Sequence, residues 1–211
     1  MADDPVDRFR GTDTSVVSDA LDDHGIPGVV DGIDAADPSF AAVGRARPVR
    51  FERARGEGST NFPFAMLEAM GAGDILVLDG VSETVSCWGG RASELAAAAG
   101  VAGVVVDGGY RDVPEIRDGG FPVFDAAPTP RSGQGRMRVA ATDAATTVRG
   151  VRVAPGDVVV ADATGVVVVP ADDAPAVAET AAGIAAEETE LEAAIKDGAT
   201  AADLRDEGRE F

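Results

Sequence analysis

The sequence is poor in the side chains that most enzymes use for covalent and acid–base chemistry. Among 211 residues there is one cysteine, Cys87, one histidine, His24, and one lysine, Lys196. A single cysteine excludes an intrachain disulfide, and one cysteine with one histidine cannot form a structural zinc site within the chain. A Ser-His-Asp triad would need His24, and no G-x-S-x-G motif accompanies it. The chemistry is therefore left to Asp, Glu and Arg, with a hard metal ion as a further option.

His24 and Lys196 also lie in places that do not favour catalysis. His24 falls in the last turn of a predicted helix, where a histidine interacts favourably with the helix dipole, so a structural role is favoured. Lys196 is the sole candidate for a Schiff base, and it lies in an acidic segment with a helical pattern. Cys87 and Trp88 are more typical of packing, although Trp88 is in a position to form the wall of a pocket.

Long apolar runs and basic residues are scarce as well. No segment approaches the ~20 apolar residues of a membrane-spanning helix, and the acidic start "MADDPVDRFRGTD" lacks the apolar segment of a signal peptide. The chain has 37 acidic and 18 basic residues, a formal net charge of −19, and the acidic residues are spread along its length. Such a surface repels nucleic acid and anionic lipid. We therefore expect a cytoplasmic protein that binds neither.

The near-absence of lysine, together with abundant Asp, Ala and Val, favours a protein from a halophile. At ~1 M salt the Debye length is only ~3 Å, so the self-repulsion of an acidic surface is screened. An ordinary acidic protein is the alternative interpretation.

Helix and strand patterns mix along the whole chain, and no linker long enough to divide it is present. We therefore predict a single α/β domain over residues 1–211, in which residues 174–211 form a C-terminal helical extension. Its long helix covers 174–196, with Asp173 as a plausible cap and Pro175 in the first turn. The other expected elements are helices over 15–24 (capped by Thr12 or Thr14), 61–70 and 91–99, and strands over 73–80, 101–107, 120–130 and within 156–170.

Charged residues follow the buried strand over 101–107, which ends at Asp107. Two glycines and a tyrosine come next, and then Arg111 and Asp112. In an open α/β sheet, ligands bind outside the carboxyl ends of the strands. The helix over 91–99 runs back against this strand, so its N-terminus lies at the same edge. Gly89 and Gly90 keep side chains away from the free N–H groups there, which is an anion-binding arrangement.

These features predict one crevice that holds backbone amides, a guanidinium and one or two carboxylates. The amides and Arg111 would bind a substrate carboxylate or keto oxygen, because the planar guanidinium matches a carboxylate with two hydrogen bonds. Asp112 would hold a divalent ion, because Mg²⁺ prefers oxygen ligands. The alternative is a surface turn without a function. The glycine patterns "GAGDIL" and "GQGRMR" lack a third glycine and do not support dinucleotide binding.

The segments "VSDALDDHGI", "GDILVLDG", "WGGRASELAAAAGVAGVVVDGGYRD" and "FPVF" occur in this order. Together they resemble the family that includes 4-hydroxy-4-methyl-2-oxoglutarate aldolases and the regulator of ribonuclease activity A. The similarity covers roughly residues 12–170, and the part from Trp88 to Asp112 is the specific one. The resemblance implies a three-layer β/β/α swivelling-type fold, assembled as homotrimers or homohexamers with sites between subunits.

The resemblance also implies a class II lyase that uses Mg²⁺ or Mn²⁺. Such enzymes cleave 4-hydroxy-2-oxo acids to pyruvate and a second carbonyl compound, and they often decarboxylate oxaloacetate. Carried over, Arg111 would bind pyruvate and stabilise its enolate, and Asp112 would be the direct metal ligand. The carboxylate would lie on the backbone of the turn and helix start formed by Gly89, Gly90, Arg91 and Ala92.

Three points leave alternatives open. Some family members carry an acidic residue at the position of Gly90, so the ordering of water differs here. A glutamate from a neighbouring subunit approaches the metal in the family, and Glu187 or Glu188 would supply it in this chain. The regulator branch of the family suggests a second function, a non-catalytic protein that binds an RNA-processing enzyme. A methyltransferase is the third hypothesis, and no glycine-rich nucleoside-binding loop supports it.

Overall fold

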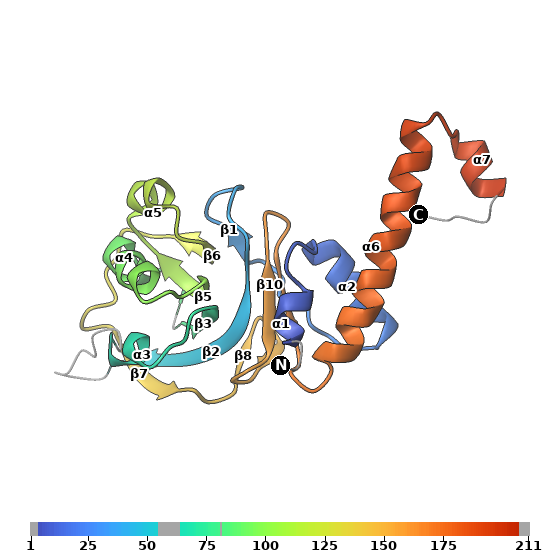
Figure 1. Cartoon of the computed structure of the whole chain (residues 1–211). Coiled ribbons are helices and arrows are strands. Elements are labelled where there is room, and N and C mark those ends of the chain that lie inside the picture. The colour runs from blue at the N-terminus through green and yellow to red at the C-terminus, as the bar shows by residue number, and fades with distance from the viewer. Residues whose placement is uncertain (1–3, 55–63, 81, 207–211) are drawn as a thin grey trace.

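A strongly curved nine-stranded sheet organises the chain (Figure 1). The computed structural model describes residues 4–54, 64–80 and 82–206. In the order in which they pair, the strands are β1 (Asp34–Ala35), β6 (Val123–Pro128), β5 (Gly103–Tyr110), β3 (Asp74–Asp79), β2 (Ala42–Arg53), β10 (Val158–Ala161) and β11 (Val166–Val169). Strand β4 (Ser86–Trp88) pairs with β5, and β7 (Met137–Thr142) pairs with β2. A separate hairpin consists of β8 (Thr146–Val148) and β9 (Val151–Val153).

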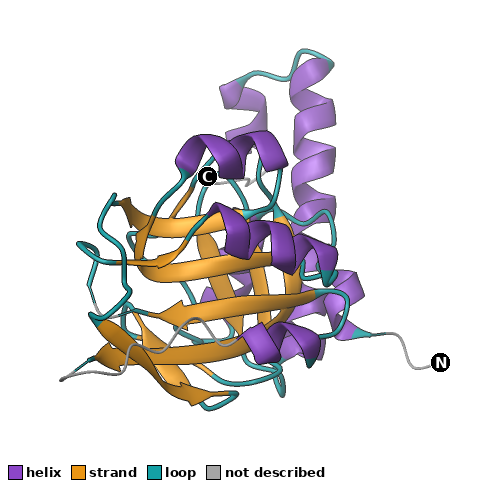
Figure 2. Cartoon of the chain, turned by 90° about the vertical axis from the view of Figure 1, so that its left-hand side faces the viewer, coloured by secondary structure: helices purple, strands orange, loops and turns teal. Residues whose placement is uncertain are grey.

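The parallel part of the sheet carries its helices on the outer face. Strands β2, β3, β5 and β6 run parallel to one another. The runs "ILVL" and "GVVV" in β3 and β5 are buried, as expected for parallel strands covered on both faces. Figures 1 and 2 show the short helices on this side of the sheet. They are α3 (Phe64–Glu68), α4 (Gly90–Ala98) and α5 (Val113–Gly119).

The β10–β11 hairpin separates two hydrophobic cores. Val158 and Val160 belong to one cluster, whereas Val159, between them, belongs to the other. This alternation follows from the two-residue repeat of a strand. The smaller cluster lies under α1 (Pro5–Arg8), α2 (Thr14–Asp23) and the first half of α6 (Ala174–Lys196). Helix α6 projects beyond the sheet and is followed by α7 (Ala201–Asp206), as Figure 1 shows.

The predicted fold class is confirmed, since the chain forms a layered α/β structure of the β/β/α type with a long C-terminal helix. Helix α6 has the predicted bounds, 174–196. The helix expected over 61–70 is described from Phe64 to Glu68, and residues 61–63 lie outside the described part of the chain. No helix among the described residues is long and apolar enough to cross a membrane.

The prediction for the cap of the first long helix was wrong. Asp13 is the N-cap of α2, and its side chain makes no capping hydrogen bond. The carboxylate of Asp162 takes that role instead, because it accepts hydrogen bonds from both the N–H and the hydroxyl of Thr14, at 2.8 and 2.7 Å. Asp162 lies 148 residues away in the sequence, so no local pattern could identify this cap.

Candidate active site

The ends of β4 and β5 bring the predicted residues together. The N–H of Arg111 donates to the carbonyl of Trp88 at 3.1 Å, and the N–H of Gly90 donates to Oδ2 of Asp112 at 3.2 Å. These two hydrogen bonds join the start of α4 to the start of α5. The N-terminus of α4 therefore lies beside the carboxyl end of β5, as the sequence predicted.

Strand β5 begins two residues later than predicted and ends three residues later, at Tyr110, immediately before Arg111. The chain is closely surrounded at Gly109. A Cβ atom at position 109 would lie 2.4 Å from Cγ2 of Thr129 and 2.8 Å from the carbonyl of Glu83. Asp112 then adopts a left-handed conformation, with φ 63° and ψ 37°, and caps α5. A non-glycine residue in this region is strained, and such residues concentrate at functional sites.

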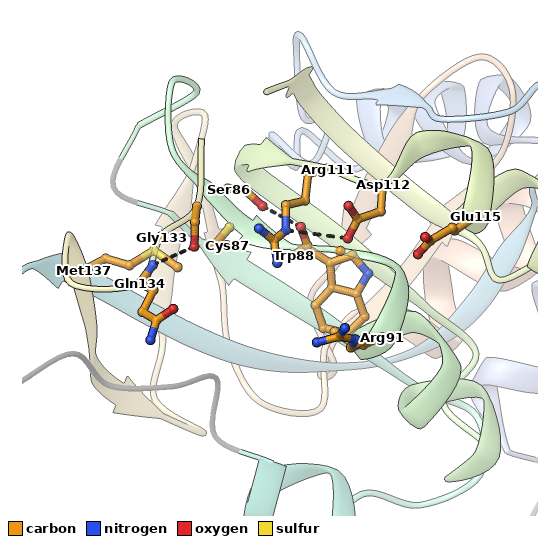
Figure 3. A pocket seen from close by; sticks show the side chains of 13 residues that line it. Ser86, Cys87, Trp88, Arg91, Arg111, Asp112, Glu115, Gly133, Gln134 and Met137 are labelled. Atoms are coloured by element: carbon orange, nitrogen blue, oxygen red, sulfur yellow. Dashed lines mark hydrogen bonds and ion pairs between the residues drawn. The ribbon is translucent and has the colours of Figure 1, made fainter. Parts of the chain in front are cut away.

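Most of the predicted site residues line one pocket of about 500 Å³ (Figure 3). Gly89, Arg91 and Ala92 come from the start of α4, and Arg111 and Asp112 come from the β5–α5 junction. The volume suits a small organic ligand. The remaining lining residues are Ser86, Cys87, Trp88, Glu115, Ser132, Gly133, Gln134 and Met137.

Arg111 and Asp112 make only a loose ion pair. The distance from Nε of Arg111 to Oδ2 of Asp112 is 3.5 Å, and the two side chains are 44% and 35% exposed. An exposed ion pair of this kind contributes little to stability. Among the described residues, Oδ1 of Asp112 has no hydrogen-bonding partner. Both side chains are therefore available to a ligand.

The anion-binding turn offers fewer free amides than the sequence predicted. The N–H of Gly90 is bonded to Asp112, so Gly90 lies behind the pocket and does not line it. The N–H of Ala92 donates to the carbonyl of Gly89 at 3.1 Å. Within the described part of the chain, the N–H of Arg91 is the amide at this helix start that has no partner. A ligand carboxylate would therefore meet this amide and the guanidinium of Arg111.

Glu115 is a pocket residue that the sequence analysis missed. Its carboxylate lies against Gly90, because a Cβ atom at position 90 would be 2.3 Å from Oε2 of Glu115. The same Cβ atom would be 3.4 Å from Cβ of Asp112. A larger residue at position 90 would therefore require the Glu115 carboxylate to move, and the side chains of Asp112 and Glu115 flank this position. The spacing of three residues between them was the available signal, since such residues share a helix face.

The walls of the pocket are apolar or inert. The indole N–H of Trp88 donates to Oγ of Ser93 at 2.8 Å, and its ring stacks on Phe121 with centroids 6.1 Å apart. Trp88 is 2% exposed and thus forms a fixed wall. Burial raises the pKa of the Cys87 thiol to about 12. Cys87 is therefore protonated at neutral pH and cannot serve as a nucleophile.

Asp107 does not join the pocket. Its Oδ1 accepts a hydrogen bond of 2.7 Å from Nε of Arg149, which also contacts Glu83 at 2.5 Å. Arg149 lies in the turn of the β8–β9 hairpin with a φ of 49°. Of the two aspartates considered for the crevice, Asp112 lines the pocket, whereas Asp107 belongs to an ion-pair cluster with Arg149 and Glu83.

The other singled-out residues lie away from the pocket. Nε2 of His24 is 2.9 Å from Oγ1 of Thr180, which agrees with the structural role favoured by the sequence. Lys196 is exposed and pairs with Glu192 at 3.0 Å. Glu187 and Glu188 lie on the exposed part of α6, which Figure 1 shows on the opposite side of the molecule from α4 and α5. Within one chain they do not line the pocket.

Comparison with known proteins agrees with this architecture. A model of the RraA-like family, described as Aldolase/RraA, matches residues 14–168. The chain belongs to the RraA-like family. An RraA-like relative from Halalkalibacterium halodurans, named "Putative 4-hydroxy-4-methyl-2-oxoglutarate aldolase", is 32% identical over 206 residues, which cover 94% of this chain and 91% of the relative.

Two further relatives match over only part of their own length. The chain spans 31% of Protein DlpA of Legionella pneumophila, with 28% identity over 194 residues, which are 90% of this chain. The match to an uncharacterized protein of Methanocaldococcus jannaschii covers 61% of that protein and 62% of this chain, with 39% identity over 131 residues.

Solved structures share the fold over nearly the whole chain. An uncharacterized protein from Pseudomonas syringae superposes with a TM-score of 0.85 and 28% identity, covering 95% of this chain and 96% of its own. The Streptomyces coelicolor protein RraAS2, described as an unusual member of the RNase ES inhibitor RraA family, has a TM-score of 0.78 and 29% identity. That match covers 92% of this chain and 96% of RraAS2. The RraA-like family thus contains proteins named as aldolases and proteins named as ribonuclease inhibitors.

Proposed function

We propose that this RraA-like protein is a divalent-metal-dependent lyase. It cleaves 4-hydroxy-2-oxo acids to pyruvate by a retro-aldol reaction, and it decarboxylates oxaloacetate. The observation that carries the proposal is the pocket itself, in which the guanidinium of Arg111, the carboxylate of Asp112 and the amide of Arg91 surround one small cavity. The aldolase name of the Halalkalibacterium halodurans relative supports the same reaction class.

The acidic residues of the pocket fit Mg²⁺ or Mn²⁺. Asp112 has one carboxylate oxygen engaged by Gly90, and its other oxygen has no partner within the described residues. Glu115 lies on the other side of Gly90. No group of three or more His, Cys, Asp or Glu side chains that could hold a metal occurs among the described residues. A site with one or two carboxylates suits Mg²⁺, which keeps several of its waters. Asp112 would bind the ion, with Glu115 beside it.

The reaction leaves negative charge on the pyruvate unit. When the C4 hydroxyl loses its proton to a base such as water, C4 becomes the carbonyl of the second product and the C3–C4 bond breaks. The electron pair of that bond remains on C3 and is shared with the keto oxygen as an enolate, which takes up a proton at C3 to give pyruvate. Arg111 would bind the carboxylate and keto oxygen and stabilise the enolate as it forms. A bound divalent ion would supply Lewis-acid polarisation of that carbonyl. Lys196, the one lysine of the chain, does not line the pocket and pairs with Glu192 at 3.0 Å, which favours the enolate route over a Schiff base.

The remaining part of the site belongs to the assembly. We propose a homotrimer or homohexamer in which an acidic residue of a neighbouring subunit, Glu187 or Glu188, approaches the metal. The exposure of these residues on the projecting part of α6 supports this arrangement, because a helix that stands clear of its own fold is free to contact another copy of the chain.

A non-catalytic regulator is the second candidate function. The similarity to RraAS2, whose description names the RNase ES inhibitor family, favours it. In this case the acidic surface, with a net charge of −19, would bind an RNA-processing enzyme. Capture of a ribonuclease by the purified protein, without any turnover of 2-oxo acids, would support regulation over catalysis.

The test of the proposed function is an assay of pyruvate release. The purified protein is given oxaloacetate or a 4-hydroxy-2-oxo acid, and pyruvate is measured with and without Mg²⁺ or Mn²⁺. We expect turnover that requires the metal and is lost on addition of EDTA. Absence of turnover with both substrates in the presence of metal, at low and at molar salt, would contradict the proposal.

A further inference from the structure

Helix α5 carries two acidic residues of the pocket, Asp112 as its N-cap and Glu115 in its first turn. The helix has seven residues, and a helix of this length is not stable by itself in water. Contacts with the rest of the fold must therefore set its position. Ile116, which is 1% exposed, fixes one face of the helix in the main core.

Arg117 makes the second attachment of this helix. Its Nε donates a hydrogen bond of 2.7 Å to the carbonyl of Ala36, which lies 81 residues earlier in the sequence. Ala36 directly follows β1, and its own N–H donates to the carbonyl of Val123 at 2.9 Å. Strand β1 pairs with β6 at the edge of the sheet (Figure 1). Arg117 therefore joins α5 to the sheet at a point that the pocket residues do not touch.

Two acidic residues lie near enough to the Arg117 guanidinium for its charge to act on them. Its charge contributes to lowering the pKa of Asp37, after the larger effect of hydrogen bonds from Ser39. It also acts on Asp125 of β6, which is 6% exposed and has no side-chain hydrogen bond within the described part of the chain. Asp125 lies opposite Asp34 in the β1–β6 ladder. The Arg117 guanidinium thus lies near the edge strand β1, where Asp34 and Asp125 lie opposite each other.

We infer that Arg117 is a positioning residue, which fastens helix α5 to the β1–β6 edge and thereby fixes Asp112 and Glu115 in the pocket. The expected effect of Arg117 on turnover rests on the proposed lyase function. The expected effect of Arg117 on the position of α5 does not depend on that function.

One buried carboxylate near Arg117, that of Asp125, has a raised pKa. Burial, followed by the charge of Asp34, raises the pKa of Asp125 to about 7, and Arg117 acts in the opposite direction. Tyr110 of β5 is a further titratable group near Asp125, and its pKa is raised by burial and by the charge of Asp125. No ion pair joins Arg117 to Asp125 among the described residues, so the hydrogen bond from Arg117 to the carbonyl of Ala36 is the contact on which the inference rests.

The experiment compares Arg117→Met with Arg152→Met by hydrogen exchange. Arg152 is an exposed arginine of β9 that lies outside the pocket and forms no ion pair among the described residues, so it is a matched control. We expect exchange in α5 of Arg117→Met to be about tenfold faster than in wild type, while α4 keeps its wild-type rate. Arg152→Met should leave both helices unchanged, and Arg117→Lys should restore part of the protection.

Two results would overturn the inference. One is exchange in α5 at the wild-type rate in Arg117→Met, and the other is an equal increase in α4 and α5, which would indicate general destabilisation. If the wild-type protein turns over oxaloacetate, the variant should also have a lower kcat and bind Mn²⁺ about tenfold more weakly, since Asp112 is then less well placed. If the wild type shows no turnover, the proposed function fails, and the exchange data still decide the role of Arg117.

Discussion

The chain contains two arginine–aspartate groups with similar composition and different bonding. Arg47 of β2 is 19% exposed, and its guanidinium is fully engaged, with hydrogen bonds of 2.7 and 2.8 Å to Asp143 and 2.7 Å to Asp74. Arg111 is 44% exposed and lies 3.5 Å from Asp112. Both Asp143 and Asp112 have left-handed backbone conformations, with φ values of 49° and 63°.

The difference shows how the same residue types serve structure in one place and remain available to a ligand in another. The hydrogen bonds of Arg47 lower the pKa of Asp143 and raise that of Arg47, so both charges are satisfied within the fold. Around Arg111 the protein supplies a cation and carboxylates without pairing them closely. Groups that fold into a pocket without internal partners retain their capacity to bind.

The largest expected effect comes from one chemical change made in both groups. Asp112→Asn should lower metal-dependent turnover by roughly 1000-fold or more, because the amide removes the charge that holds the metal. Asp143→Asn should leave kcat within about twofold of wild type and reduce the free energy of unfolding by about 1 kcal/mol, since its exposed ion pair is partly screened. Asparagine tolerates the left-handed conformation at both positions. Turnover measured together with denaturant unfolding distinguishes the two. Equal loss of turnover in both variants would contradict the comparison.

The arginines provide a second, smaller contrast. Arg111→Lys should lower kcat/KM by about 100-fold, because a lysine cannot bind carboxylate and keto oxygen with a planar fork. Arg47→Lys should instead reduce the free energy of unfolding by about 1–2 kcal/mol, since it loses hydrogen bonds to two carboxylates. Steady-state kinetics and urea unfolding give the two quantities. If Arg111→Lys keeps wild-type kcat/KM, the guanidinium has no special role.

Titration of Asp125 gives a third contrast, because this buried carboxylate forms no ion pair among the described residues. Burial raises its pKa from 3.8 to about 7. Between these pH values the unfolded chain has lost the proton while the folded chain keeps it, so stability falls as pH rises through this window. Asp125→Asn should therefore stabilise the protein relative to wild type by about 1–3 kcal/mol more at pH 8 than at pH 5. Urea unfolding at both pH values measures this difference, and a pH-independent difference would contradict the assignment.

The smallest effect concerns salt. With a net charge of −19, the folded chain is destabilised by self-repulsion, which salt screens. Raising KCl from about 0.1 to about 2 M should increase Tm by several degrees. The increase in Tm with KCl should be nearly the same for Asp143→Asn as for wild type. The reason is that Arg47 contacts Asp143 directly, at 2.7 Å, and salt screens such a short-range pair less than it screens the long-range repulsion. A Tm that falls with KCl would argue against salt adaptation.

The local features of the site could be predicted from the sequence because they depend on neighbours along the chain. The buried run before Asp107 indicates a strand, and the alanine-rich segment after Gly90 indicates a helix that returns to the same edge. From these two elements the approach of Arg111 to the 89–92 turn follows directly. The long helix over 174–196 is equally local, since its pattern and its proline define it.

Other features depend on contacts between distant segments. Asp107 stays outside the crevice because its carboxylate binds Arg149, which lies in a hairpin 42 residues later in the sequence. Another side of the pocket is formed by Ser132, Gln134 and Met137. An isolated β-bridge between Ser86 and Ser132 places this segment there, and no sequence motif predicts that bridge. The sequence predicts a free N–H at Gly90, but this N–H donates to the carboxylate of Asp112. That hydrogen bond joins the starts of two helices that are separate in the sequence. Pairings of this kind are visible in three dimensions and leave no periodic signal in the sequence.

The most direct test of the central claim is a crystal structure with Mn²⁺ and pyruvate bound. The account predicts anomalous density for Mn²⁺ beside the carboxylate of Asp112, and pyruvate between the N–H of Arg91 and the guanidinium of Arg111. Pyruvate bound elsewhere, or Mn²⁺ held by residues away from Asp112 while this pocket stays empty, would contradict it.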